Sequence, residues 1–143
     1  MNNTASTDPG GIRGGLHPII LIADDTQSSR ELLRSILEAG GYGVIEAEDG
    51  EQAIEMAFAS DPDLIILDLH MPKLDGRDVA AQLRRAVKFQ KTPIIALTAA
   101  VSESMPEQIA QAGFTDYLAK PIGPARLREF IARLLKSTQA VMS

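Results

Sequence analysis

Residues 19–27 read IILIADDTQ, a run of apolar residues that ends on two adjacent carboxylates, Asp24 and Asp25. A run this apolar predicts a strand that is buried on both faces, as strands of parallel sheets are. Adjacent carboxylates repel each other, and their burial is costly unless a cation compensates their charge. The nature of that cation is the first question that this sequence raises.

Length and composition limit the classes of protein that the chain can belong to. Its 143 residues suffice for one domain with a single core, and 45% hydrophobic with 23% charged residues is ordinary globular composition. The net charge of −5 argues against a nucleic-acid partner, and no basic amphipathic helix suggests a membrane surface. There is no cysteine, which excludes disulfides and thiolate catalysis. Without a membrane-length apolar run or a signal-peptide pattern, we expect a soluble cytoplasmic domain.

The chain divides into two polar ends and a patterned middle. We expect a flexible, glycine-rich tail over residues 1–17, one domain over 18–136 and a second flexible tail over 137–143. Within the domain, short apolar runs alternate with helical patterns. The predicted strands are 18–23, 42–47, 63–68, 92–98 and 115–119, and the predicted helices are 28–41, 50–60, 77–87, 104–113 and 123–136.

Local patterns predict further details of the helices. Ser104 and Glu107 fit a capping box with Pro106 in the first turn, so the fourth helix is expected to begin late. Arg84 and Arg85 are expected on a solvated helix face. The residues of the first two helices that we expect to face the core are Leu32, Leu33, Ile36, Leu37, Ala53, Ile54, Ala57 and Phe58.

Five strands that alternate with five helices predict an α/β fold with a parallel sheet covered on both faces. Right-handed crossovers make a doubly wound (βα)5 sheet of the flavodoxin-like type the simplest topology, with strand order 2-1-3-4-5. In that order the switch point lies between the first and third strands. Ligands of such sheets bind there, at the carboxyl ends of the strands.

Polar residues end four of the five predicted strands. Asp24 and Asp25 follow the first strand, Asp68 ends the third, Thr98 ends the fourth, and Lys120 follows the fifth. Three converging carboxylates favour a hard divalent cation, Mg²⁺ in particular. The lysine and the hydroxyl add groups that bind an anion with several oxygens, which suits phosphoryl transfer. As the central acid, Asp68 is best placed to act as a nucleophile and form an aspartyl phosphate.

Each of these residues also has a simpler interpretation when it is considered alone. Asp24 and Asp25 could cap the first helix, because acids favour helix N-termini, and Asp68 could be an ordinary acid at a strand end. Thr98 could be a satisfied strand-end hydroxyl, and Lys120 a solvated surface lysine. With Asp68 opposite the acid pair, metal binding becomes the favoured interpretation.

Four motifs occur in order at the predicted strand ends: ADD at 23–25, DLHMPKLDG at 68–76, LTAA at 97–100 and YLAKPI at 117–122. Each motif is weak alone, but together, with their spacing, they are specific. From about Pro18 to Lys136 the chain resembles the response-regulator receiver domains of two-component signalling, the CheY-like superfamily. The resemblance implies a function in phosphorelay signal transduction.

The resemblance also implies roles for the residues of the acid cluster. Asp68 would be the phosphorylation site and accept a phosphoryl group from a histidine kinase or a histidine phosphotransfer protein. Mg²⁺ would be bound by Asp25, Asp68 and the backbone carbonyl of His70, with Asp24 acting mainly through metal-bound water. The side chains of His70 and Ala100 would lie at the pocket rim and tune hydrolysis of the aspartyl phosphate.

Further roles follow for the residues that would respond to phosphorylation. Thr98 would donate a hydrogen bond to the phosphoryl group, and Lys120 would form an ion pair with it. Tyr117 would be the switch aromatic that turns inward when Thr98 moves, although half-buried packing is an alternative role for this ring. The bond between Lys120 and Pro121 would be cis.

The leading hypothesis is a stand-alone module, switched by phosphorylation, with no DNA-binding output domain after Lys136. It would be no enzyme beyond its own phosphorylation and dephosphorylation. It would contact a downstream protein through the fourth helix, fifth strand and fifth helix, as a monomer or a weak phosphorylation-dependent dimer. Pro106 departs from the family pattern at the start of that surface. A related alternative is a receiver domain from a hybrid histidine kinase.

Two alternatives come from other classes of protein. An Mg²⁺-dependent phosphatase of the haloacid-dehalogenase type also forms an aspartyl phosphate, but it needs a second acid two residues after the nucleophile, where this chain has His70. A flavodoxin-like FMN carrier needs a phosphate loop rich in Ser, Thr and Gly after the first strand. Here the acids Asp24 and Asp25 would repel the phosphate.

Overall fold

The computed structural model of the protein describes the backbone from residue 17 to 142 and the side chains from 17 to 136. The strands are β2 (Ile19–Ala23), β3 (Gly43–Ala47), β4 (Leu64–Asp68), β5 (Ile94–Thr98) and β6 (Asp116–Ala119). The helices are α2 (Gln27–Ala39), α3 (Gly50–Ser60), α4 (Gly76–Arg84), α5 (Met105–Ala112), α6 (Pro124–Met142) and the short 3₁₀ helix η1 (Val87–Phe89).

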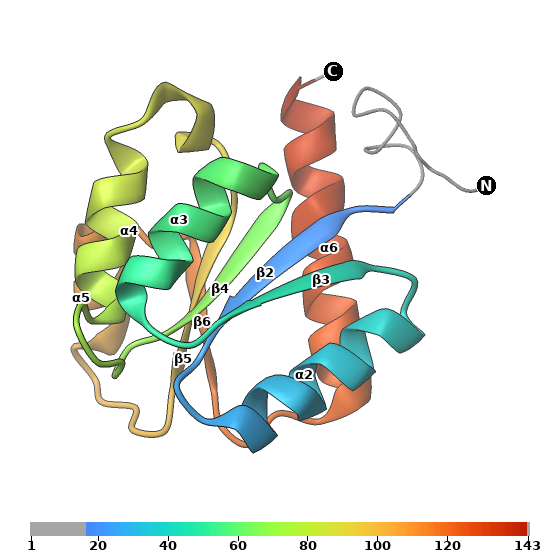
Figure 1. The fold of residues 1–143 in the computed structure, drawn as a ribbon, viewed down its shortest axis with the longest axis horizontal. Coiled ribbons are helices and arrows are strands. Elements are labelled where there is room, and N and C mark those ends of the chain that lie inside the picture. The colour runs from blue at the N-terminus through green and yellow to red at the C-terminus, as the bar shows by residue number, and fades with distance from the viewer. Residues whose placement is uncertain (1–16, 143) are drawn as a thin grey trace.

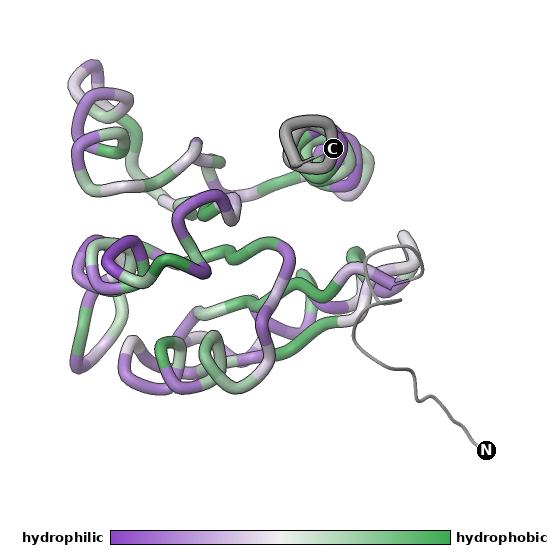
Figure 2. The backbone as a smooth tube through the Cα atoms, turned by 90° about the horizontal axis from the view of Figure 1, so that it is seen from above, coloured by the Kyte–Doolittle hydropathy of each residue, from purple (hydrophilic) through white to green (hydrophobic). Residues whose placement is uncertain are grey.

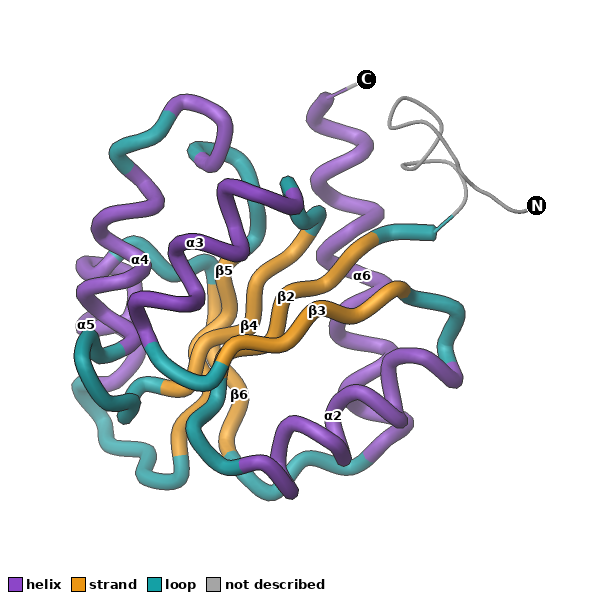
Figure 3. Tube along the Cα trace, in the orientation of Figure 1, coloured by secondary structure: helices purple, strands orange, loops and turns teal. Residues whose placement is uncertain are grey.

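The five strands form one parallel sheet in the order β3-β2-β4-β5-β6. Counted along the chain this is the order 2-1-3-4-5, so the predicted doubly wound fold is confirmed. Figure 3 shows the strands side by side, with the helices packed around them. Among the described residues, no helix is both long and apolar enough to cross a membrane.

Alternate residues of each strand point into two separate cores, because side chains alternate across a sheet. On β2, Leu21 and Ala23 belong to the core beneath α3, α4 and α5, whereas Ile20 and Ile22 belong to the core beneath α2 and α6. Figure 1 shows these two groups of helices on opposite faces of the sheet. In Figure 2 the hydrophobic strand segments run between the helices. The sheet is therefore a rigid central layer, and its ends position the polar residues that follow.

Two of the residues expected in the core lie at the surface. Leu32 is 59% exposed and Phe58 is 45% exposed, so their predicted burial is wrong. The buried stripe of α2 includes Arg30, Leu33 and Leu37, and Leu32 lies beside this stripe. Phe58 packs its ring edge-on against Phe89 at the rim of a core, with the ring centroids 5.1 Å apart.

The end of α4 differs from its prediction. The helix ends at Arg84, three residues before the predicted end, and η1 follows. Arg84 is half-buried and not solvated as expected, whereas Arg85 is exposed. The guanidinium of Arg84 donates to the carbonyl oxygens of Gly113 at 2.8 Å, Phe89 at 2.5 Å and Thr92 at 2.7 Å. This arginine therefore satisfies carbonyl groups at the end of η1, in the loop before β5 and at the C-cap of α5.

The late start of α5 is confirmed, but the predicted capping box is wrong. The helix begins at Met105 with Pro106 in its first turn. Ser104 has φ −86° and ψ −5° and makes no side-chain cap. A capping serine normally has extended dihedral angles, and Ser104 instead accepts a hydrogen bond from Nε2 of Gln108 at 3.2 Å.

The last helix extends beyond residue 136, where the sequence predicts the end of the domain. α6 continues to Met142, so the backbone is helical over residues 137–142, where a tail was predicted. No proline or glycine in this stretch ends the helix earlier. The predicted N-terminal tail lies outside the described residues, apart from His17.

Candidate functional site

The register of the sheet brings the acidic residues together. Ala23 on β2 pairs with Leu67 on β4, so the next residues, Asp24 and Asp68, lie at the same level at the carboxyl ends of two neighbouring strands. Asp24, Asp25 and Asp68 each offer a carboxylate oxygen, and these oxygens all lie within 4.8 Å of one another. The expected convergence of the three acids at the switch point is therefore confirmed.

Asp24 is the most enclosed of the three acids, with no exposed surface. Its Oδ1 accepts the backbone N–H of Thr26 at 2.9 Å, and its Oδ2 accepts the Ser29 hydroxyl at 2.7 Å and the Lys120 ammonium at 3.0 Å. Burial raises the pKa of the Asp24 carboxyl, but the hydrogen bonds from Ser29, Thr26 and Lys120 outweigh burial, so the pKa lies below its ordinary value. The structure therefore holds Asp24 as a compensated buried anion.

Asp68 ends the central strand of the sheet, and its side chain is 10% exposed. Its Oδ1 accepts the backbone N–H of His70 at 2.9 Å, and its Oδ2 accepts the Lys120 ammonium at 2.9 Å. Gly76 packs tightly behind it, because a Cβ at that position would lie 2.5 Å from the backbone oxygen of Asp68. The carboxylate is thus fixed in direction and still reachable from solvent.

Lys120 is the cation that the buried acids require. Its ammonium bridges Asp24 and Asp68, and its side chain is 28% exposed. Burial lowers the pKa of Lys120, but the hydrogen bonds to Asp68 and Asp24 outweigh burial and hold the pKa above its ordinary value. The bond from Lys120 to Pro121 is cis, as the resemblance implies. The backbone N–H of Lys120 donates to the carbonyl of Thr98 at 2.8 Å, which ties β6 to β5 beside the site.

Asp25 is exposed, and its carboxylate has no hydrogen-bond or ion-pair partner within the described part of the chain. With Asp24 and Asp68 it brings three formal negative charges, of which Lys120 offsets one. The remaining two charges match a divalent cation, and carboxylate oxygens are the ligands that Mg²⁺ prefers. The residues present therefore fit the predicted magnesium ion. His70 follows β4, and its imidazole is exposed.

Thr98 and Tyr117 lie on the neighbouring strands, but nothing in the described range links either side chain to the acids by a hydrogen bond. Thr98 is 1% exposed. Its hydroxyl donates to the carbonyl of Ala100 at 2.7 Å and accepts the N–H of Ala100 at 3.1 Å. Tyr117 is half-buried and packs against the core beneath α3, α4 and α5. Ala100 is exposed, like His70.

Two residues that contact the site were not predicted from the sequence. The Ser29 hydroxyl binds the Asp24 carboxylate, and the Arg30 guanidinium donates to the Asp24 backbone oxygen at 2.7 Å. Both belong to the first turns of α2. For Arg30, the sequence offers one indication, which is its place near the start of a helix. A cation there is unfavourable for the helix dipole, so a compensating contact is expected.

Fold and site together define a flavodoxin-like α/β domain with an acidic site at its switch point. The family model described as the response regulator receiver domain matches residues 20–132. The chain therefore belongs to the family of response-regulator receiver domains. Members of this family accept a phosphoryl group on an aspartate, bind Mg²⁺ in the acidic site, and interact with histidine kinases and phosphotransfer proteins.

Three relatives illustrate the range of proteins that contain such a domain. The alkaline phosphatase synthesis transcriptional regulatory protein PhoP of Bacillus subtilis is 40% identical over 122 residues, covering 84% of this chain and 49% of PhoP. This chain thus spans about half the length of that relative. The structure of the chemotaxis response regulator CheY4 of Vibrio cholerae is 30% identical, with a TM-score of 0.79, and the match covers 82% of this chain and 98% of CheY4.

The third relative is the receiver domain of the sensor histidine kinase PA1611 from Pseudomonas aeruginosa PAO1. Its structure is 33% identical to this chain, with a TM-score of 0.78, and the match covers 84% of this chain and 98% of that one. That structure has a magnesium ion coordinated in its active site cleft.

Proposed function

We propose that Asp68 is the residue of this receiver domain that accepts a phosphoryl group from a phosphohistidine. The observation that carries the proposal is the position of its carboxylate, which ends the central strand, contacts Lys120 and lies within the acid cluster. Asp24 is a weaker candidate, because it is fully buried and already accepts three hydrogen bonds. Asp25 lacks a cation partner among the described residues.

In the proposed reaction, a carboxylate oxygen of Asp68 forms a bond to phosphorus while the bond from phosphorus to the donor imidazole nitrogen breaks. The bonding electron pair leaves with the imidazole. The ammonium of Lys120 pairs with the phosphoryl oxygens as charge accumulates on them. Asp25, Asp68 and the His70 carbonyl would hold Mg²⁺ directly, with Asp24 acting through its water, and the ion neutralises charge on the phosphoryl oxygens when bound.

The proposed switch begins at Thr98. Its hydroxyl contacts only Ala100 among the described residues, so it can exchange this local hydrogen bond for one to a phosphoryl oxygen. Movement of Thr98 would let Tyr117 turn inward and change the surface formed by α5, β6 and α6. Phosphorylation would then bias an equilibrium between two conformations of that surface, which a downstream protein reads. The exposed rim residues His70 and Ala100 would tune how fast the aspartyl phosphate hydrolyses.

The proposed acceptor is tested by intact mass after incubation with acetyl phosphate, with Mg²⁺ or with EDTA. We expect one phosphoryl adduct on the wild type with Mg²⁺ and none on Asp68→Asn. Asp78→Asn is the matched control, because Asp78 is an exposed acid on α4 and lies outside the cluster. An adduct on Asp68→Asn would refute the assignment of the acceptor.

Rapid hydrolysis can hide the adduct, so the second arm uses beryllofluoride, a stable mimic of the phosphoryl group. Amide NMR should then show shifts at Asp68, Thr98 and Tyr117 in the wild type and none in Asp68→Asn. If neither reagent changes the wild type, the site does not bind a phosphoryl group, and the proposed function is wrong. The same samples, measured by light scattering, test the proposed weak dimer of the activated form.

Three contexts for the domain are compatible with this site. CheY4 is a chemotaxis response regulator, the PA1611 domain belongs to a sensor histidine kinase, and PhoP is a transcriptional regulatory protein about twice as long as this chain. In any of these contexts, we propose that the domain signals by contact with a protein. The size of the native protein on an immunoblot distinguishes these contexts, because a transcriptional regulator like PhoP would be about twice as heavy as the 15.4 kDa of this chain and a hybrid kinase several times heavier.

A further inference from the structure

Arg30 is a buried arginine beside the acidic site. It lies in the first turns of α2 and is only 9% exposed. Burial of a guanidinium is costly, and a cation near a helix N-terminus opposes the helix dipole. The packing of α2 does not explain a buried arginine, because the other buried residues of this helix are apolar. The contacts of the guanidinium must therefore compensate the cost of its burial, and one of these contacts is to the acidic site.

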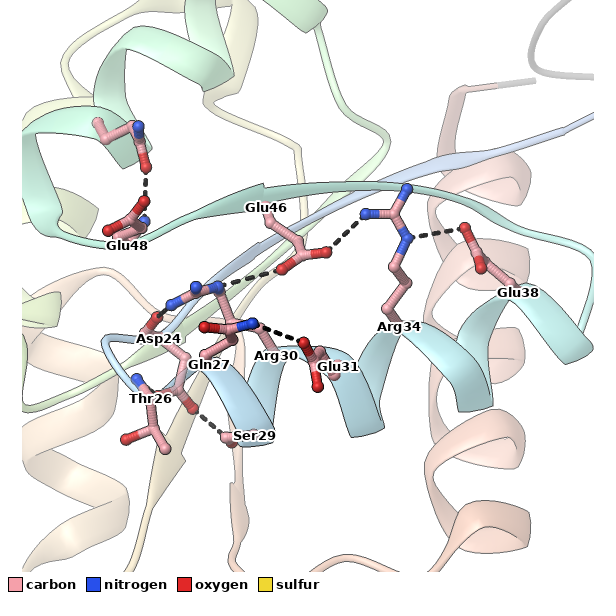
Figure 4. Close-up of polar contacts among 11 residues, drawn as sticks. Asp24, Thr26, Gln27, Ser29, Arg30, Glu31, Arg34, Glu38, Glu46 and Glu48 are labelled. Carbon is pink, nitrogen blue, oxygen red and sulfur yellow. Dashed lines mark hydrogen bonds and ion pairs between the residues drawn. The ribbon is translucent and has the colours of Figure 1, made fainter.

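The guanidinium connects the acid pair to the edge strand of the sheet. Nη1 of Arg30 donates to the backbone oxygen of Asp24 at 2.7 Å, and Nε donates to Oε1 of Glu46 on β3 at 3.1 Å. The other oxygen of Glu46 accepts Nη1 of Arg34 at 2.6 Å. Figure 4 shows Arg30 between Asp24 and Glu46, with Arg34 on the far side of Glu46.

The carbonyl that Arg30 holds belongs to the peptide plane between Asp24 and Asp25. Because this plane is rigid, the direction of the carbonyl also sets the direction in which the chain enters Asp25. Within residues 17–136 the Asp25 carboxylate has no hydrogen-bond partner of its own. Its position therefore depends on the backbone, which β3 also holds through the hydrogen bond from the Asp24 N–H to the Ala47 oxygen at 3.1 Å.

We propose that Arg30 is a positioning residue for the cation site: by holding the Asp24 carbonyl, it places the Asp25 carboxylate beside Asp24 and Asp68. The inference rests on the proposed function, because it concerns the same magnesium site. It adds a residue outside the acid cluster on which the affinity for the divalent cation depends.

Arg34 provides a matched control within the same helix. It lies four residues further along α2 and shares Glu46 with Arg30, but its second partner is Glu38, and its side chain is 44% exposed. Substitution of either arginine by methionine removes one positive charge near the acids. Charge alone would make both variants bind Mg²⁺ more tightly. Positioning by Arg30 predicts the opposite sign, and only for Arg30→Met.

The test is an amide NMR titration with MgCl₂ at constant ionic strength, since the chain has no tryptophan to report binding by fluorescence. We expect Arg30→Met to weaken Mg²⁺ binding about tenfold, the lower range for loss of an outer contact to a metal site. Arg34→Met should bind as the wild type does or slightly more tightly. Arg30→Lys should bind Mg²⁺ more tightly than Arg30→Met but less tightly than the wild type, because a single ammonium cannot reproduce the planar guanidinium that donates to both Asp24 and Glu46.

Urea unfolding of the same variants separates positioning from stability. If Arg30 only fastens α2 to β3, both methionine variants lose stability and keep the wild-type Mg²⁺ affinity, which overturns the proposal. Equal weakening in both variants overturns it as well. Should Arg30→Met fail to fold, Arg30→Lys carries the test, and an affinity equal to that of the wild type refutes the inference. A wild type that does not bind Mg²⁺ refutes the site itself, and with it the proposed function.

Discussion

Lys120 is the only side chain of the described range that forms ion pairs with the acid cluster, and its removal should be costly when no metal is bound. Lys120→Met leaves the fully buried Asp24 and the nearly buried Asp68 without their shared cation. Charge-assisted hydrogen bonds are worth about 1.5–3 kcal/mol each. Removing one partner of a buried ion pair costs about 3–5 kcal/mol. Because the lysine is 28% exposed, we expect a loss of stability at or below the lower end of that range, about 2–3 kcal/mol.

The assay is urea unfolding at neutral pH in EDTA, followed by circular dichroism. Lys73→Met is the matched control. Lys73 also pairs with two acids, Asp49 at 3.6 Å and Glu51 at 3.8 Å, but its side chain is 58% exposed. Its removal should cost less than about 1 kcal/mol, as exposed ion pairs do. Mg²⁺ should restore stability to Lys120→Met, by about 2.7 kcal/mol at a free concentration of 100 times the dissociation constant.

The cost of Lys120→Met should also depend on pH, with a definite sign. Lys120 is among the groups that hold the pKa of Asp24 below its ordinary value of 3.8. A lowered pKa in the folded state stabilises the protein above the ordinary value, and this contribution is lost as the pH falls through the folded-state pKa. The difference between wild type and variant should therefore be largest near neutral pH and shrink below about pH 4. If the wild type and Lys120→Met have the same free energy of unfolding in EDTA at neutral pH, within about 0.5 kcal/mol, Lys120 is not the compensating cation.

Two further predictions concern residues around the site. Gly76→Ala should lower stability by about 1–3 kcal/mol, because the added Cβ would lie 2.5 Å from the backbone oxygen of Asp68. The resulting shift of Asp68 should also weaken Mg²⁺ binding. Gly123→Ala, where a Cβ has no heavy atom within 4 Å, should change stability by less than about 1 kcal/mol. Glu46→Gln should cost about 1 kcal/mol at neutral pH, because the hydrogen bonds from Arg34 and then Arg30 outweigh burial and hold the pKa of Glu46 below its ordinary value of 4.5. In urea unfolding, that cost should disappear as the pH falls below 4.5 and then through the lower pKa of Glu46 in the folded state. A cost that does not depend on pH would contradict the ion pairs of Glu46.

The general architecture could be predicted because it depends on short-range patterns. The apolar runs before Asp24, Asp68 and Thr98 are long enough for buried parallel strands, and the helical patterns between them require crossovers. Once the order of strands follows, the acids must meet at one edge. Both the sheet order and the convergence of the three carboxylates agree with the structure.

The errors share one cause, which is that a pattern does not determine which face of an element is covered. Leu32 and Phe58 fit the helical period but lie beside the buried stripe. Arg84 was expected to be solvated, yet it donates to the carbonyl groups of Phe89, Thr92 and Gly113. Ser104 has the residue type of a cap but the dihedral angles of a helix. These outcomes depend on how each segment packs against its neighbours in the fold, which the residue types alone do not specify.

The sequence by itself determined the order of the elements and the residue types at the strand ends, because hydrophobic periodicity and chain connectivity are local properties. Only the tertiary structure decided how the charges are compensated. Lys120 lies 96 residues from Asp24 and 52 from Asp68, yet its ammonium contacts both carboxylates. Arg30 on α2 contacts Glu46 on β3 and the backbone of Asp24. Buried charges must find partners wherever the fold brings them, and no pattern along the chain specifies which residues these are.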